Sequence, residues 1–129
     1  MNEQELAFTL NMFEQQINQL QQQIQVIEAG INELSSLSLS LDDLKNSKGK
    51  EVFAAVGRGI YTKARLESEE LTVDIGNQNF VKKSIPETKE LIDTQVNKLE
   101  KIKEDVQQSL EEVNKQLTKI IIEAQEKEI

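Results

Sequence analysis

Apolar residues recur with a helical period near both ends of the chain. Near the start, the intervals alternate between four and three residues, which is the heptad spacing of a coiled-coil helix. These positions are Leu6, Leu10, Phe13, Ile17, Leu20, Ile24, Ile27, Ile31 and Leu34. A second stripe consists of Ile92, Val96, Leu99, Ile102, Val106, Leu110, Val113, Leu117, Ile120 and Ala124. The spacing predicts two long helices, over residues 1–46 and 85–129, that pair as an antiparallel coiled-coil hairpin.

Each stripe contains one irregular step. After Leu34 the next apolar residue is Leu37, and two successive steps of three predict a stammer, which overwinds a coiled coil locally. The run "SLSLSL" that follows alternates like a strand, but we interpret it as helix. In the second stripe, two steps of four between Ile102 and Leu110 predict loose packing. Pro86, two residues after Ser84, fits the first turn of the second helix.

Between the two stripes the period changes from helical to alternating. Ile60, Thr62, Ala64 and Leu66 alternate with polar or charged residues, as do Leu71, Val73 and Ile75. Such alternation predicts strands. The segments "EVFAAV" and "NFVKKS" supply two more, so the chain is predicted to be α+β, mainly α, with two β-hairpins over residues 51–83. We expect the whole chain, residues 1–129, to form a single domain.

The segment Gly57-Arg58-Gly59 has the glycine content of a ligand-binding loop or of a turn. A phosphate-binding loop has a longer glycine-rich turn that opens into a helix. Here the segment leads from one strand into another, where glycine makes positive φ angles cheap. We interpret Gly57 and Gly59 as a tight hairpin connection, and Gly76 as part of a second turn.

Isolated β-hairpins are marginally stable in water, and their edges leave backbone groups unpaired. We therefore expect the hairpins of several chains to assemble into a common β-barrel or sandwich between subunits. The residues expected to be covered by this assembly are Val56, Ile60, Leu66, Leu71, Val73, Ile75 and Val81.

Composition and charge narrow the classes of function. The chain has no Cys and no His, so thiol nucleophiles, imidazole bases and the usual zinc ligand sets are missing, and we predict no enzyme, metal or cofactor. The net charge is −8, and residues 1–44 hold seven acidic and no basic residues. Such a segment repels polyanions. With no apolar run near the roughly 20 residues of a membrane span, we expect a cytoplasmic protein that binds neither nucleic acid nor membrane.

Three motifs carry a resemblance to a known family. The blocks "VGRGIYTKA", "VDIG" and "VKKSIPE", in this order between two heptad helices, resemble the alpha-type subunit of prefoldin, whose two hairpins distinguish it from beta-type subunits. The family often has Pro at Ala55, Gly at Gln78 and Glu at Lys82. The resemblance implies a hexamer of two alpha and four beta subunits around a double β-barrel. It also implies helical tips that hold unfolded proteins, without nucleotide, for a group II chaperonin.

Several large apolar residues crowd the ends of the two predicted helices, where the resemblance places client binding. Phe8, Met12, Ile121 and Ile122 lie off the heptad seam and have no obvious partner within the chain. The candidate client-binding residues are Leu6, Phe8, Leu10, Met12, Phe13, Ile120, Ile121 and Ile122. For Leu6, Leu10, Phe13 and Ile120 a place in the coiled-coil core is the first interpretation.

Two other functions remain open from the residues alone. The chain fits a structural coiled-coil adaptor or tether that self-assembles or binds one specific partner. A nucleic-acid module is disfavoured by the acidic first helix, and an enzyme by the lack of a catalytic constellation.

Overall fold

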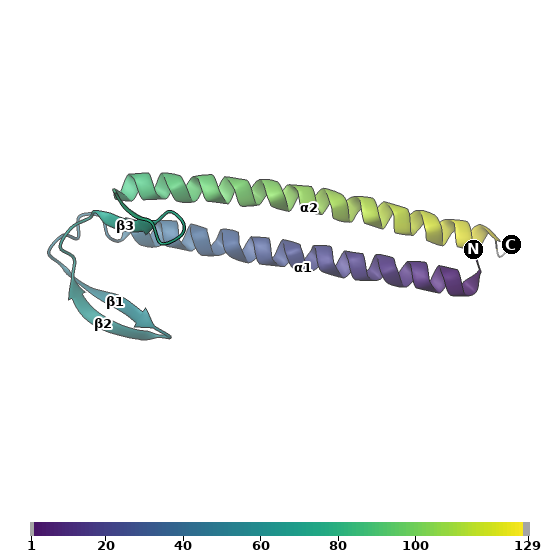
Figure 1. Ribbon diagram of the computed structural model, residues 1–129, viewed down its shortest axis with the longest axis horizontal. Coiled ribbons are helices and arrows are strands. Elements are labelled where there is room, and N and C mark those ends of the chain that lie inside the picture. The colour runs from purple at the N-terminus through teal and green to yellow at the C-terminus, as the bar shows by residue number, and fades with distance from the viewer. Residues whose placement is uncertain (1, 128–129) are drawn as a thin grey trace. The chain divides into compact units, whose positions relative to one another are not determined.

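The computed structural model describes residues 2–127 and contains two long helices joined by two β-hairpins (Figure 1). This is the predicted fold class. The elements, in chain order, are α1 (Glu3–Asp42), β1 (Glu51–Gly57), β2 (Ile60–Arg65), β3 (Leu71–Asp74), β4 (Phe80–Lys83) and α2 (Ile85–Lys127). The chain divides into two compact units. A helical unit comprises the residues up to Asn32 and those from Asn97 onward, and a hairpin unit comprises Glu33–Val96.

In the helical unit, α1 and α2 run side by side in opposite directions, so that the start of α1 and the end of α2 lie at the same end of the pair (Figure 1). The α1 seam positions are all half-buried, and so are the α2 positions Leu99, Val106, Leu110, Val113, Leu117, Ile120 and Ala124. The predicted heptad seam therefore forms the contact between the two helices. At the start of α1, the side chain of Asn2 caps the helix by accepting a hydrogen bond from the backbone N–H of Glu5 (2.8 Å).

The seam of α2 differs from the prediction at one position. Ile102, expected in the seam, is 49% exposed, and Lys103 takes its place with a side chain that is only 25% exposed. The Nζ atom of Lys103 lies 3.4 Å from Oε1 of Glu28 on α1. The physical reason is that Leu99, Lys103, Val106 and Leu110 keep the alternation of four and three, whereas the predicted double step of four departs from it.

The hairpin unit holds the most deeply buried apolar residues of the described chain. Leu41, Ile85 and Ile92 form this core, and Leu34, Leu44, Leu71 and Val96 pack against it. The predicted stammer is absent, because half-buried Ser38 occupies the α1 seam and Leu37 is exposed. With Ser38 in the seam, the steps from Leu34 to Leu41 are four and three residues, so the helix need not overwind and Leu41 lies in the core. The run "SLSLSL" is helical, as interpreted.

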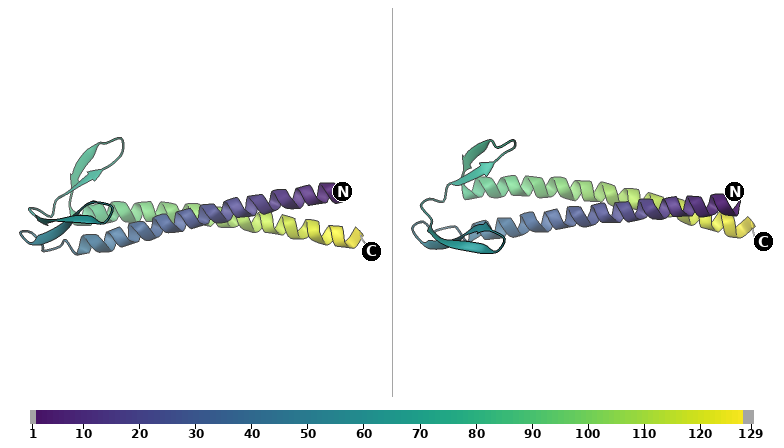
Figure 2. Two further views of the ribbon diagram at one scale, coloured as in Figure 1. Left: turned by 90° about the horizontal axis from the view of Figure 1, so that it is seen from below. Right: turned by 60° about the horizontal axis from the view of Figure 1, so that its bottom comes forward.

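The four strands form two separate two-stranded antiparallel sheets (Figure 2). In the first, β1 pairs with β2 from Glu51 opposite Arg65 to Gly57 opposite Ile60, with a register irregularity between Ala55 and Gly57. In the second, β3 pairs with β4, and Val73 lies opposite Val81. Neither hairpin gains a third strand from residues 2–127, so the outer edges of both leave backbone groups without a strand partner there.

The start of α2 is fixed by a capping box. The backbone N–H of Glu87 donates to Ser84 Oγ (3.2 Å), and the backbone N–H of Ser84 donates to Glu87 Oε1 (3.0 Å). This second bond, followed by the hydroxyl contact, lowers the pKa of Glu87. Nearby, Lys89 Nζ donates to Asp42 Oδ1 (2.6 Å), which joins α2 to the end of α1 and lowers the pKa of Asp42.

Candidate functional site

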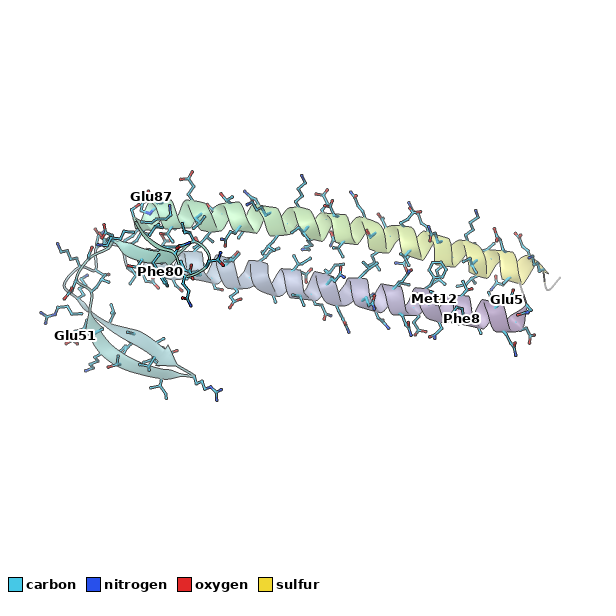
Figure 3. The ribbon with its side chains drawn as sticks, viewed as in Figure 1. Glu5, Phe8, Met12, Glu51, Phe80 and Glu87 are labelled. Carbon is cyan, nitrogen blue, oxygen red and sulfur yellow. The ribbon has the colours of Figure 1, made fainter. Side chains whose placement is uncertain are left out.

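Exposed apolar side chains gather on the helical unit close to the chain ends. Phe8 is 66% exposed and Met12 is also exposed, and both lie on α1 near its N-terminal end (Figure 3). Ile121 and Ile122 are exposed near the C-terminal end of α2. The heptad seam explains why these four side chains find no cover within the chain, since they lie on other faces of their helices than the seam residues.

The other four residues of the predicted tip have partners within the chain. Leu6, Leu10, Phe13 and Ile120 are half-buried in the seam. Leu6 of α1 and Ile120 of α2 line the same small cavity of about 70 Å³. Ala124, Glu123 and Lys127 complete its lining. These contacts fit the interpretation of the four residues as coiled-coil core, and a role in client binding stays a prediction for the whole set.

The predicted assembly residues of the hairpins fall into two groups. Val56, Ile60 and Ile75 are exposed, while Leu66, Leu71, Val73 and Val81 are half-buried. Leu71 packs against the core of the hairpin unit, and Val73 lies opposite Val81 on the same face of its hairpin. The exposed residues of the first group and the half-buried residues of the second give the hairpins apolar surface that this chain does not fully cover.

Sequence analysis missed three exposed aromatic residues on the hairpins. Phe53 on β1, Tyr61 on β2 and Phe80 on β4 all project into solvent. Phe80 is labelled in Figure 3. The sequence pattern predicts one apolar face for each hairpin, and these three residues lie on the other face. There Phe53 is the cross-strand partner of Lys63, and Phe80 is that of Asp74. The signal that would have found them is an aromatic residue at a strand position expected to be polar.

The segment Gly57-Arg58-Gly59 is a hairpin turn, as predicted. Gly57 lies opposite Ile60, so Arg58 and Gly59 form the two-residue connection, with φ angles of +47° and +78°. Two positive φ angles are typical of the turns that match the twist of a β-hairpin. The second turn is similar at Asn77 and Gln78, with φ angles of +51° and +61°. There Gln78 adopts a conformation that glycine enters without steric cost.

The described residues offer no arrangement typical of catalysis. Among residues 2–127, no three His, Cys, Asp or Glu side chains lie close enough to hold one metal ion. A hollow of about 680 Å³ beside the start of α2 is lined by side chains of both charges, including Lys45, Glu69, Lys82 and Glu87. Several of its polar groups are already paired, since Glu69 accepts a hydrogen bond from the backbone N–H of Asn46 (2.6 Å).

No helix in the described part of the chain has an apolar stretch long enough to span a membrane.

Two long paired helices joined by two β-hairpins define a class of coiled-coil proteins with exposed strands. The model for the prefoldin subunit family matches residues 13–129. The chain belongs to the prefoldin family.

The chain is similar to archaeal alpha subunits of prefoldin. The chain is 36% identical to that of Methanobrevibacter smithii over 97 residues, which are 74% of this chain and 66% of the relative. It is 34% identical to that of Methanopyrus kandleri over 118 residues, which are 84% of this chain and 75% of the relative. For Methanosphaera stadtmanae the identity is 24%, over 70% of this chain and 66% of the relative. The chain thus spans slightly less than two thirds of two of these relatives.

A solved structure shares the fold. A chain of filamentous PFD from Methanocaldococcus jannaschii, determined by cryo-electron microscopy, superposes with a TM-score of 0.82 at 22% identity. The match covers 91% of this chain and 98% of the other. The arrangement of two helices and two hairpins is therefore that of a prefoldin subunit, as the sequence motifs indicated.

Proposed function

We propose that this chain is the alpha-type subunit of a cytoplasmic, ATP-independent co-chaperone. In this proposal two alpha and four beta subunits form a hexamer through their hairpins. The free ends of the helices capture unfolded proteins, prevent their aggregation and transfer them to a group II chaperonin. Membership of the prefoldin family supports the co-chaperone role in general.

Assembly is supported by the apolar residues that the hairpins leave in solvent. Ile75 is 56% exposed although it follows a strand whose other inward residues, Leu71 and Val73, are half-buried. Burying a side chain of this size contributes about 1.5–3 kcal/mol. Pairing with a second sheet would cover such residues and would also satisfy the backbone groups at the open edges.

Client capture is supported above all by the exposed apolar cluster at the ends of the helices, formed by Phe8, Met12, Ile121 and Ile122. Phe and Met adapt to partners of different shape, because their apolar surfaces need no matching hydrogen bonds and methionine is flexible. Each contact alone would be weak. Six helical pairs in one assembly would add such contacts through avidity, so no deep pocket is needed.

The proposal is tested by replacing Phe8, Met12, Ile121 and Ile122 with Ser. Because these side chains are exposed, the variant is expected to keep its helical content and to assemble with beta-type subunits at unchanged mass. It should lose most of its ability to suppress aggregation of a chemically denatured client, measured by light scattering during dilution from denaturant.

The matched control is Leu39→Ser, which removes an equally exposed apolar side chain from α1 in the hairpin unit. It should hold clients as the parent chain does. If the fourfold variant still suppresses aggregation, the client site lies elsewhere. If the parent chain forms a uniform assembly without beta-type subunits and holds no unfolded protein, a structural adaptor or tether is the better description.

A further inference from the structure

The outward face of α1 in the helical unit carries a second heptad stripe. Its positions alternate by four and three residues, and all of them are exposed. They are Phe8, Met12, Gln15, Gln19, Gln22, Val26 and Ala29. None is charged, and no Asp, Glu, Lys or Arg occurs anywhere from Gln15 to Ile27. The stripe exposes Phe8, Met12 and Val26 and contains no charge, although the chain has a net charge of −8, so it is suited to packing against another helix.

This outward face borders a groove. The groove has a volume of about 470 Å³. It is lined by Gln19, Gln22, Gln23, Val26 and Ile27 of α1 and by Ile102 and Val106 of α2. Val26 is 73% exposed and Ile102 is 49% exposed. Ile102 is available to the groove because Lys103, and not Ile102, lies at the half-buried seam position.

The same face also carries Phe8, an exposed aromatic side chain that could fill an apolar groove. If two copies of the face meet antiparallel about residue 17, position 8 of one lies opposite position 26 of the other. Position 12 then lies opposite 22, and 15 opposite 19. The stripe is therefore self-complementary, with a projecting aromatic residue at one end and an apolar groove at the other. A twofold interface requires this property, because the same patch serves both partners.

We propose that two copies of this chain dock antiparallel through the outward faces of α1, with Phe8 of each copy seated in the groove beside Val26 and Ile102 of the other. Positions 8 to 26 span about 27 Å of helix. With two apolar contacts at each end and glutamines between them, the interface belongs to the weak, transient class. It forms at high protein concentration or when many copies are held close together.

Charge sets the conditions for this docking. The stripe is uncharged, but residues 1–44 hold seven acidic and no basic residues, so charge repulsion between two copies opposes this docking. Added salt screens charges more than about 10 Å apart at 0.1 M, so docking should strengthen as salt is raised. Because Phe8 and Met12 also belong to the proposed client-binding cluster, docking would cover them until a client competes. Only this last consequence rests on the proposed function.

The register is tested by disulfide cross-linking, because the chain has no native cysteine. Phe8→Cys and Val26→Cys are made separately, each in the full chain with Ile75→Asp to weaken assembly through the hairpins. On oxidation, the mixture of the two variants should cross-link in large excess over either variant alone. Cross-linking that is as efficient in Phe8→Cys alone, or absent from the mixture, overturns the antiparallel arrangement.

Self-association is tested by sedimentation velocity over rising concentration in the same Ile75→Asp background. Val26→Asp should abolish the dimer with helical content unchanged, whereas Gln25→Asp, which adds the same charge one residue away and off the stripe, should change it less than about twofold. A chain that is monomeric throughout overturns the proposal, as does a monomer whose groove binds only a foreign amphipathic helix. Made without Ile75→Asp, so that assembly with beta-type subunits is kept, Val26→Asp should still suppress client aggregation. Failure of the docking and failure of the proposed function therefore give different results.

Discussion

The paired helices and the hairpins use their apolar residues in opposite ways. Along the seam of the helical unit, nearly every apolar position is half-buried against the facing helix, so the seam itself is already covered within the chain. On the hairpins, Phe53, Val56, Ile60, Tyr61, Ile75 and Phe80 are all exposed. A helix satisfies its own backbone and needs one apolar stripe covered, whereas a two-stranded sheet has two faces and two open edges. We therefore expect the stable assembly to form through the strands, and the contact proposed between α1 helices to be the weaker of the two.

The largest effect is expected from placing a new charge on the apolar face of a hairpin. Ile75→Asp places a carboxylate on an exposed position that assembly is expected to bury, so the isolated subunit should tolerate it and the oligomer should not. We expect complete loss of the assembly with beta-type subunits, measured as mass by light scattering. Circular dichroism should show unchanged helix content, because α1 and α2 pair through their own seam.

Thr72→Asp is the matched control for this experiment. Thr72 lies on the opposite face of β3, opposite Lys82, where a new carboxylate gains an opposite charge. This variant should assemble normally. An Ile75→Asp chain that still forms the full assembly would show that this face stays in solvent, and the contrast between helices and hairpins would lose its functional meaning.

The seam offers a second, smaller test of the comparison. Replacing Lys103 with Leu completes the apolar seam, and burying a side chain of this size contributes about 1.5–3 kcal/mol. The Glu28 side chain, which loses its partner, is 48% exposed and stays hydrated. We expect a higher thermal midpoint by circular dichroism. Because Lys103 is partly exposed, the gain should fall in the lower part of that range.

Lys101→Leu serves as the control for Lys103→Leu, because Lys101 is exposed and lies outside the seam. It should leave the midpoint nearly unchanged. If both variants change the thermal midpoint equally, Lys103 does not lie in the seam, and Ile102 takes the seam position that the sequence pattern predicts.

The sequence predicted the elements of the fold better than it predicted individual side chains. Long heptad stripes and alternating segments identify helices and strands, because each period is set by backbone geometry. The pattern misplaced Leu37 and Ile102, since an apolar residue beside a seam position looks the same in the sequence as one within it. Which residue enters the seam depends on the register against the facing helix, and here Lys103 lies in the seam, 3.4 Å from Glu28 of α1.

The candidate sites show the same division. The exposure of Phe8 and Met12 followed from their distance from the seam, and the turn at Arg58 followed from its glycine neighbours. The groove beside Val26 could not be predicted from the sequence. It forms only because Ile102, about 75 residues further along the chain, lies outside the seam. A surface formed by two segments far apart in the sequence cannot be predicted from the spacing of apolar residues within either segment.

The junction between hairpin and helix gives the smallest expected effect. Ser84→Ala removes the hydroxyl that accepts the backbone N–H of Glu87, and the loss of such a cap costs about 1 kcal/mol. The lowered pKa of Glu87 adds a pH dependence. A carboxylate with a lowered pKa stabilises the fold above its ordinary pKa, and this contribution is lost as the pH falls through the folded value.

Glu87→Gln separates the charge from the hydrogen bond at this junction. The amide can still accept the backbone N–H of the Ser84 residue but does not titrate in acid, so the loss of stability on acidification should be smaller than in the parent chain. Thermal midpoints measured between neutral pH and the acidic range check this. An identical pH profile for Glu87→Gln and the parent would assign the acid sensitivity to other carboxylates, with Asp42 the first to examine because its contact with Lys89 also lowers its pKa.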